Sequence, residues 1–140
     1  MNIYFACSIT GGREDEPIYQ QIVAVLHAEG HEVPTALLAG SDVMALEVIV
    51  DPVTVYTRDT GWIVGCDLLV AEVSTPSHGV GYEIGYALGL GKPVLCLHRE
   101  GTPVSKMISG NRDPLLTVLA YSDGDDALQQ LRDYLGRVNA

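Results

Sequence analysis

Basic residues are scarce in this chain, in which 8 lysines and arginines stand against 18 aspartates and glutamates, a formal net charge of −10 over 140 residues. Proteins bind the phosphate backbone of nucleic acids mainly through lysine and arginine, so a nucleic acid polymer is not expected as a partner. A site for a small anion would have to be positive locally, through helix N-termini, backbone amides and a few cations, because the charge of the whole chain opposes it.

Long apolar runs are missing too, and no stretch of about 18 apolar residues is present to cross a membrane. The chain enters an apolar strand pattern at residues 2–8, without the basic leader and the apolar region of a signal peptide. We therefore expect a cytoplasmic protein without a membrane partner.

Motifs for cofactors and metals are also lacking. The three cysteines, Cys7, Cys66 and Cys96, show no CxxC spacing and are expected to serve as small buried hydrophobes. The histidines show no HxH or HExxH spacing, so no metal is predicted. Neither GxxxxGKS nor GxxxxGKT occurs, and the glycines of residues 79–85 follow a later strand than the first, so no dinucleotide cofactor is expected.

What the chain has is a regular alternation of apolar strands and amphipathic helices. Continuous apolar strands separated by helices are typical of a parallel sheet covered on both faces. The sequence predicts one α/β domain over residues 1–140, a doubly wound, Rossmann- or flavodoxin-like open sheet of about five parallel strands with helices on both faces. The expected strands are residues 2–8, 31–37, 67–73, 94–97 and 115–121, and the expected helices are residues 17–29, 54–64, 79–90, 104–109 and 125–138. Pro34 places the second strand near an edge, and residues 38–53 stay open between loop, helix and lid.

Two glycine-bearing loops, residues 8–13 and 74–81, follow predicted strands. Ligands of doubly wound folds bind beyond the carboxyl ends of the strands, so we expect the two loops to share one crevice. Ser77 precedes a predicted helix N-terminus, where a hydroxyl and the backbone amides can form an anion cradle. A single serine at such a place is more often an ordinary cap or turn residue.

Two carboxylates, Glu83 and Asp59, are candidates for chemistry at this crevice. Either one alone fits a solvated helix carboxylate. Together they can divide the cleavage of a glycosidic bond, with one attacking the anomeric carbon and the other handling the proton or orienting its partner. We expect the helix dipole to keep Glu83 ionised, as a nucleophile requires.

Three blocks of sequence carry a family resemblance: residues 3–15 (IYFACSITGGRED), 70–85 (VAEVSTPSHGVGYEIG) and 105–110 (SKMISG). They resemble the nucleoside 2-deoxyribosyltransferase family, and within it the 2′-deoxynucleoside 5′-phosphate N-hydrolases. The resemblance implies hydrolysis of a 2′-deoxynucleoside 5′-monophosphate to a free base and 2-deoxyribose 5-phosphate. It implies that Glu83 attacks C1′ and forms a covalent glycosyl-enzyme that water opens. Asp59 would assist the leaving base or hold the nucleophile, and the Tyr4 hydroxyl would lie close to Glu83.

The same resemblance implies seven substrate-binding residues, one of them contributed by the neighbouring subunit of a homodimer. They are Ser8, Ile9, Gly11 and Arg13 in the first loop, Ser77 and Gly79 in the phosphate cradle, and Ser105 across the dimer interface.

Two residues depart from the pattern of the family. Thr10 stands where an arginine is expected in the animal hydrolases, and His78 stands where an apolar residue is expected. Loss of a fixed cation lowers affinity for a monophosphate or moves specificity towards unphosphorylated nucleosides, unless His78 or Arg13 compensates. Base exchange between deoxynucleosides and nucleotide sensing without turnover therefore stay open as alternatives, as do base and sugar preference.

Overall fold

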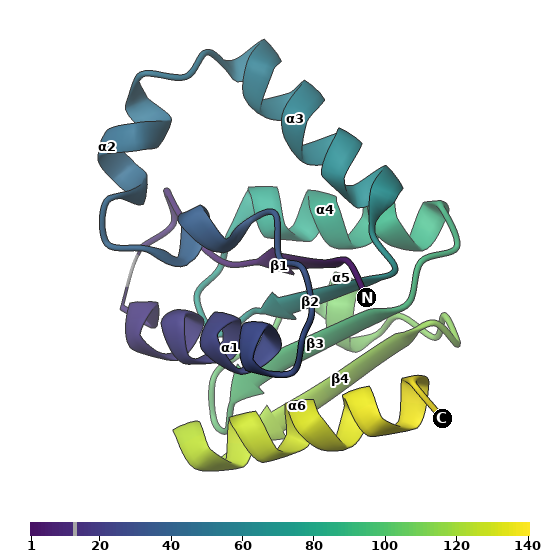
Figure 1. Cartoon of the computed structure of the whole chain (residues 1–140). Helices are drawn as coiled ribbons and strands as arrows, with labels where there is room; N and C mark the ends of the chain where they lie inside the picture. The colour runs from purple at the N-terminus through teal and green to yellow at the C-terminus, as the bar shows by residue number, and fades with distance from the viewer. Residues whose placement is uncertain (13) are drawn as a thin grey trace.

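The computed structural model describes residues 1–12 and 14–140, with residues 44–46 described by their backbone alone. Strands and helices alternate along most of the chain (Figure 1). In order, the elements are β1 (Ile3–Ala6), α1 (Glu16–Ala28), the 3₁₀ helix η1 (Ala36–Ala39), α2 (Val43–Val48), α3 (Pro52–Gly65), β2 (Leu68–Glu72), α4 (His78–Gly89), β3 (Val94–Arg99), α5 (Lys106–Ser109), β4 (Leu116–Tyr121) and α6 (Gly124–Val138).

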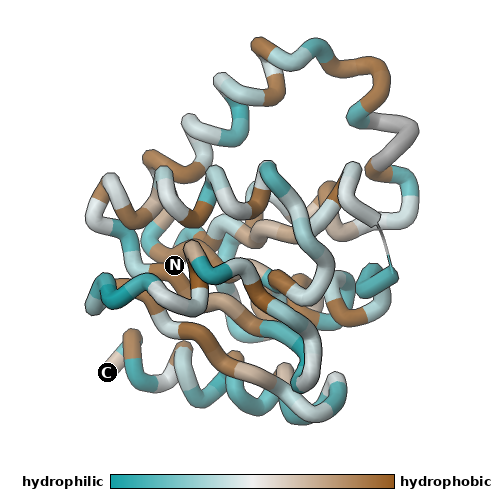
Figure 2. Tube along the Cα trace, turned by 180° about the vertical axis from the view of Figure 1, so that it is seen from behind, coloured by the Kyte–Doolittle hydropathy of each residue, from teal (hydrophilic) through white to brown (hydrophobic). Residues whose placement is uncertain are grey.

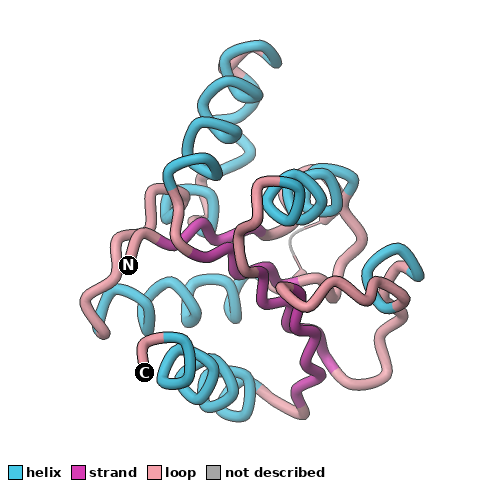
Figure 3. Tube along the Cα trace, turned by 90° about the vertical axis from the view of Figure 1, so that its right-hand side faces the viewer, coloured by secondary structure: helices cyan, strands magenta, loops and turns pink. Residues whose placement is uncertain are grey.

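The strands of the described residues form one parallel sheet in the order β1-β2-β3-β4. Figure 3 shows the sheet close to edge-on, with α1 and α6 on one face and α3, α4 and α5 on the other. Helices on both faces satisfy the need of an all-parallel sheet to be buried on its two sides. The predicted doubly wound α/β fold is confirmed.

The two faces of the sheet carry separate hydrophobic cores, because successive strand residues point to opposite sides. Ile3 and Phe5 pack in the core beneath α1 and α6, and Phe5 meets the ring of Tyr19 edge-on with the centroids 6.2 Å apart. Tyr4 and Ala6 point the other way, into the core beneath α3 and α4. This alternation places the Tyr4 side chain on the face that carries Asp59 and Glu83.

The strand predicted at residues 31–37 is wrong. In this segment one isolated parallel bridge, between Asn2 and Glu32, reaches the sheet. Pro34 has no N–H to donate to a ladder, and the Thr35 hydroxyl accepts the Phe5 N–H at 2.9 Å, where a strand would offer a carbonyl. The described sheet therefore has four strands instead of about five. The bridge still lies on the free edge of β1, where a flavodoxin-like fold carries its second strand.

Helix α3 extends beyond the sheet at its N-terminal end, at the top of Figure 1. It begins where Asp51 accepts the Thr54 N–H at 3.0 Å, with Pro52 in the first turn. Within Pro52–Gly65, all of which is described, Ile63 is the one fully buried residue. Figure 2 shows apolar residues at the α2–α3 connection, where Ile49 and Val53 are exposed. Asp59 is thus carried by a helix attached to the domain mainly through its C-terminal half.

Candidate active site

Tyr4, Asp59 and Glu83, the three predicted catalytic residues, come together on the α3–α4 face of the sheet. Tyr4 is buried in β1, while Asp59 and Glu83 are partly buried on α3 and α4, which pack against each other. The Tyr4 hydroxyl lies within hydrogen-bonding reach of Glu83. Burial, and after it the negative charges of Glu83 and Asp59, raise the pKa of Tyr4, so the phenol stays protonated and donates. Three elements distant in sequence therefore supply one cluster of side chains.

The environment of Glu83 makes its carboxyl hard to ionise. Burial raises its pKa to about 8, and the charge of Asp59 adds to this, while the hydrogen bond with Tyr4 and the charge of Arg58 lower it. α4 begins at His78, so Glu83 is the sixth residue of the helix, beyond the first turn in which the helix dipole acts. The expectation that the dipole keeps Glu83 ionised is therefore wrong, and in the protein without substrate most of this carboxyl is protonated at neutral pH.

Arg58 is the cation of this cluster, and sequence reasoning assigned it no role. Its Nε donates to Asp59 Oδ1 at 2.8 Å, and its Nη2 donates to Glu47 Oε1 of α2 at 3.0 Å. The guanidinium lies over the Trp62 ring, 5.0 Å from the centroid. Burial raises the pKa of Asp59, whereas the hydrogen bond and charge of Arg58 lower it. Arg58 thus favours the ionised form of both carboxyls, against the larger effect of burial, and ties α2 to α3.

The first loop lies directly against the second. Ser8 is fully buried at the end of β1, and Ile9 is partly exposed. A Cβ atom at Gly11 would lie 2.3 Å from the Pro76 carbonyl oxygen, so no larger residue fits there without a backbone shift. Gly12 has a φ of +129°, which favours glycine. The two loops therefore lie side by side, whereas the larger cavity is lined by residues of the second loop and by none of residues 8–12. Arg13 lies outside the described residues.

Two of the predicted phosphate ligands cap helices. Ser77 is the N-cap of α4, where its Oγ accepts the Val80 N–H at 3.3 Å, and Gly79 is exposed in the first turn. Ser105 is the N-cap of α5, where its Oγ accepts the Met107 N–H at 3.3 Å. Both serines use the oxygen as acceptor, so each hydroxyl hydrogen can still be donated to an anion.

Ser77 and Ser105 of the same chain line one cavity of about 650 Å³. The exposed His78 is also at this cavity, as are Ile84 and Leu88 on the inner side of α4. Tyr4, Asp59 and Glu83 do not line it. The cavity therefore includes the predicted cradle residue Ser77 and none of the three predicted catalytic side chains.

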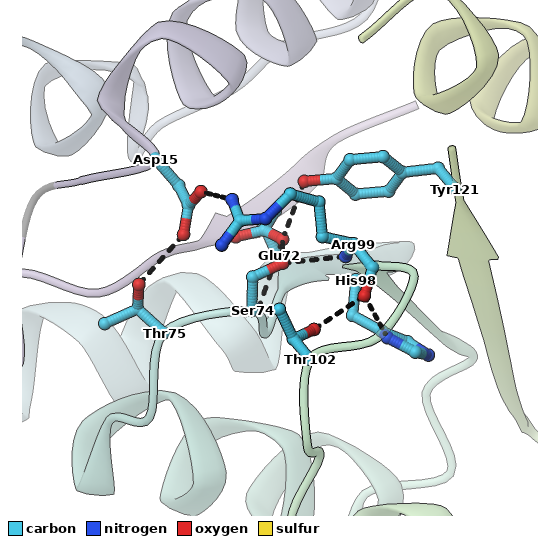
Figure 4. Close-up of polar contacts among 8 residues, drawn as sticks. All are labelled: Asp15, Glu72, Ser74, Thr75, His98, Arg99, Thr102 and Tyr121. Carbon is cyan, nitrogen blue, oxygen red and sulfur yellow. Dashed lines mark hydrogen bonds and ion pairs between the residues drawn. The ribbon is translucent and has the colours of Figure 1, made fainter. Parts of the chain in front are cut away.

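A second polar cluster, at the carboxyl ends of the strands, contains residues that sequence reasoning missed (Figure 4). Glu72 is fully buried at the end of β2, and its Oε1 accepts the Ser74 N–H at 3.2 Å, the Ser74 hydroxyl and the Tyr121 hydroxyl at 3.1 Å. Burial raises the pKa of Glu72, with Asp15 adding to the effect. A glutamate inside an otherwise apolar strand is the signal by which the cluster could have been found.

Asp15 forms the other half of this cluster. It is 4% exposed, its Oδ2 accepts the Thr75 hydroxyl at 2.8 Å, and its Oδ1 pairs with the Arg99 guanidinium. Among the described residues, no three histidine, cysteine, aspartate or glutamate side chains are grouped as metal ligands. In the same part of the chain, no helix combines the length and the apolar character needed to cross a membrane.

Comparison with known proteins places these features in a family. The model for nucleoside 2-deoxyribosyltransferases matches residues 3–125. The chain is 40% identical over 129 residues to the 5-hydroxymethyl-dUMP N-hydrolase of Rattus norvegicus, covering 89% of this chain and 78% of the relative. It is 40% identical over 139 residues to the protein of the same name from Esox lucius, covering 96% and 87%.

Solved structures show the same fold. The CMP N-glycosidase of Clostridium botulinum aligns with a TM-score of 0.73 over 95% of this chain and 99% of that chain, at 22% identity. At this identity the likeness concerns the fold alone. The match of the family model to most of the chain, together with relatives at 40% identity, shows that this protein belongs to the nucleoside 2-deoxyribosyltransferase family.

Proposed function

We propose that the protein hydrolyses the N-glycosidic bond of 2′-deoxynucleoside 5′-monophosphates, releasing the free base and 2-deoxyribose 5-phosphate. The observation that carries this proposal is the convergence of Glu83, Asp59 and Tyr4 beside two loops rich in hydroxyls and exposed amides. Two relatives are named for hydrolysis of 5-hydroxymethyl-dUMP, which is itself a 2′-deoxynucleoside 5′-monophosphate.

In the proposed mechanism Glu83, once ionised, attacks C1′ of the deoxyribose. The bond between C1′ and the base nitrogen breaks, its electron pair leaves with the base, and protonated Asp59 delivers a proton to the base. Asp59 then takes a proton from water, which opens the glycosyl ester and restores the Glu83 carboxylate. Burial raises the pKa of Asp59, which favours its role as an acid, and the Tyr4 hydroxyl orients Glu83 by hydrogen bonding.

The 5′-phosphate would be held without a cluster of lysines. The hydroxyl of Ser77 and the amide of Gly79 lie at the N-terminus of α4. Ser8, Ile9 and Gly11 would complete the phosphate site from the first loop, which approaches the second at Gly11 and Pro76. Hydroxyls, amides and a helix N-terminus suit a monophosphate in an acidic protein. In the proposed cytoplasmic homodimer, Ser105 of one subunit contacts the phosphate bound by the other, and Arg13 adds a cation.

The reaction is tested with a panel of ribo- and deoxyribonucleotides and their unphosphorylated nucleosides, separated by chromatography. Wild type should release base from deoxynucleoside monophosphates, and Glu83→Gln should bind the nucleotide without turning it over. Glu100→Gln, which removes an exposed carboxylate, serves as control. Release of no base from any monophosphate would contradict hydrolysis, and a new nucleoside on addition of adenine or cytosine would indicate base exchange. Binding without turnover at every pH would indicate a sensor.

The dimeric site is tested by mixing two inactive variants. If Ser105 acts across the interface, a heterodimer of Ser105→Ala and Glu83→Gln subunits contains one intact site, because each subunit supplies what the other lacks. Such a heterodimer has one of its two sites intact, and half of the dimers in a randomly reassorted equimolar mixture are heterodimers, so mixing should restore about a quarter of the wild-type activity. If Ser105 acts within its own chain, both sites of the heterodimer are defective and mixing restores nothing.

A further inference from the structure

Asp15, directly before α1, does not cap the helix that it precedes. Aspartate at an N-cap usually accepts an N–H of the first helical turn, but the Asp15 side chain makes no such bond. Its carboxylate instead accepts from Thr75 at 2.8 Å and pairs with Arg99. We name these three residues, Asp15, Thr75 and Arg99, the loop clamp. Figure 4 shows Asp15 and Thr75 pointing at each other from different segments of the chain.

The loop clamp joins the two loops that border the proposed phosphate site. Asp15 lies two residues after the first loop, directly before α1, and Thr75 lies two residues before Ser77 in the second loop. The loops also approach each other closely at another point, because a Cβ atom at Gly11 would lie 2.3 Å from the Pro76 carbonyl oxygen. The hydrogen bond between Asp15 and Thr75 therefore fixes the distance between the start of α1 and the second loop, beside the point where the two loops already lie close together.

The second loop is held from its other side as well. The Ser74 hydroxyl accepts the backbone N–H of Arg99 at 2.8 Å and donates to the buried Glu72. Glu72 is held in turn by the Tyr121 hydroxyl of β4. These contacts anchor the start of the loop to the ends of β2, β3 and β4. With Ser74 fixed to the sheet, the bond from Thr75 to Asp15 determines where the rest of the loop lies relative to the first loop.

We propose that Asp15 and Thr75 are positioning residues for the 5′-phosphate, holding the first loop and the Ser77 cradle at the separation at which donors of both loops reach one phosphate. This inference rests on the proposed function. The catalytic side chains are carried by β1, α3 and α4 rather than by the clamped loops. Loss of the clamp should therefore weaken recognition of the phosphate and leave the chemistry at C1′ largely unchanged.

Thr75→Val tests the clamp, since valine keeps the β-branched shape and removes the hydroxyl. We expect KM for 2′-deoxyuridine 5′-monophosphate to rise about three- to tenfold, with kcat changed by less than about twofold. This is less than the full effect of one hydrogen bond to a charged group, because Thr75 acts on the phosphate through the position of the loops. KM for unphosphorylated 2′-deoxyuridine should stay the same. Thr75→Ser, which keeps the hydroxyl, should restore the KM of wild type, and Asp15→Asn should show the same selective loss as Thr75→Val.

Thr102→Val is the matched control. The Thr102 hydroxyl donates to the Arg99 carbonyl oxygen at 2.6 Å. Thr102 itself does not line the cavity, although Pro103 and Ser105 of the same loop do. Thr102→Val removes a threonine hydrogen bond beside Arg99 and leaves the loop clamp intact. The ratio of its KM for 2′-deoxyuridine 5′-monophosphate to its KM for 2′-deoxyuridine should therefore equal that of wild type.

Two outcomes overturn the inference while leaving the proposed function in place. One is an equal rise of KM for the phosphorylated and unphosphorylated substrates, and the other is a lower free energy of unfolding with neither KM changed. Failure of wild type to hydrolyse any monophosphate would instead overturn the proposed function. In that case calorimetric Kd values for 2′-deoxyuridine with and without the 5′-phosphate test the clamp, and a ratio unchanged by Thr75→Val refutes it.

Discussion

Replacement of Glu83 by glutamine should stabilise the protein above about pH 5, by an amount that grows as the pH rises. The pKa of Glu83 is about 8 in the folded protein, against an ordinary value of 4.5. Between these values the folded protein holds one proton more than the unfolded chain, so the free energy of unfolding falls as pH rises. Glutamine has nearly the same shape as the protonated carboxyl and cannot ionise. The variant should match wild type near about pH 5, and its advantage in stability should grow as the pH rises to about 8.

The size of the effect follows from the same two values. Each pH unit over which the two states differ by one proton removes about 1.4 kcal/mol from the free energy of unfolding. Between 4.5 and about 8 the upper limit is therefore about 5 kcal/mol. Glu83 is partly rather than fully buried, and water at its exposed edge stabilises the ionised form. We expect an advantage of about 2–3 kcal/mol for the glutamine variant at about pH 8.5.

Urea unfolding of wild type, Glu83→Gln and Glu100→Gln at about pH 5, 7 and 8.5 measures this difference. Glu100 is an exposed carboxylate, so its variant gives the effect of removing one negative charge from the surface. The quantity of interest is the stability gained by the Glu83 variant beyond that baseline. If this gain is the same at all three pH values, ionisation of Glu83 does not lower the free energy of unfolding, and the raised pKa of Glu83 is refuted.

Further predictions concern the charge of Glu83 and the packing of the loops. Since the proposed mechanism needs Glu83 ionised and Asp59 protonated at the same time, the plot of kcat/KM against pH should be bell-shaped, and Arg58→Gln should move both limbs to higher pH, because Arg58 lowers the pKa of both carboxyls. Arg132→Gln, which removes a surface pair with a 3.2 Å contact, should leave the profile in place. Gly11→Ala puts a methyl group 2.3 Å from the Pro76 carbonyl oxygen and should cost about 1–3 kcal/mol in thermal unfolding, so a wild-type Tm would contradict the contact.

The sequence was sufficient for those parts of the fold that depend on local pattern. Continuous apolar strands predicted the parallel sheet, and most helices lie within a few residues of their expected bounds. Residues 31–37 show the limit of such patterns. The Phe5 N–H donates to the Thr35 hydroxyl instead of to a strand carbonyl, and the periodicity of the sequence cannot distinguish these two partners. Whether an apolar segment pairs as a strand depends on what its neighbour in space offers.

The candidate site divides in the same way. Tyr4, Asp59 and Glu83 could be selected by resemblance, and the structure brings them together. The protonation of Glu83 was not predictable, since it depends on burial beneath α3 rather than on position in α4. In the local sequence Asp15 is simply the residue before a helix, which indicates no special role. Its partner Thr75 lies 60 residues away in sequence. Such a pairing appears only when the chain is folded.

The slender attachment of α3 has a consequence for how the proposed acid, Asp59, reaches the proposed nucleophile, Glu83. A helix that buries Ile63 alone within its described stretch opens at a lower free energy than the sheet beneath it. Amide hydrogens near Asp59 should then exchange with solvent faster than those of β1, on which Tyr4 lies. A nucleotide that bridges Asp59 and Glu83 adds its binding free energy to the closed form and slows this exchange. Assembly of the catalytic pair is thus coupled to occupancy by a ligand long enough to span both helices.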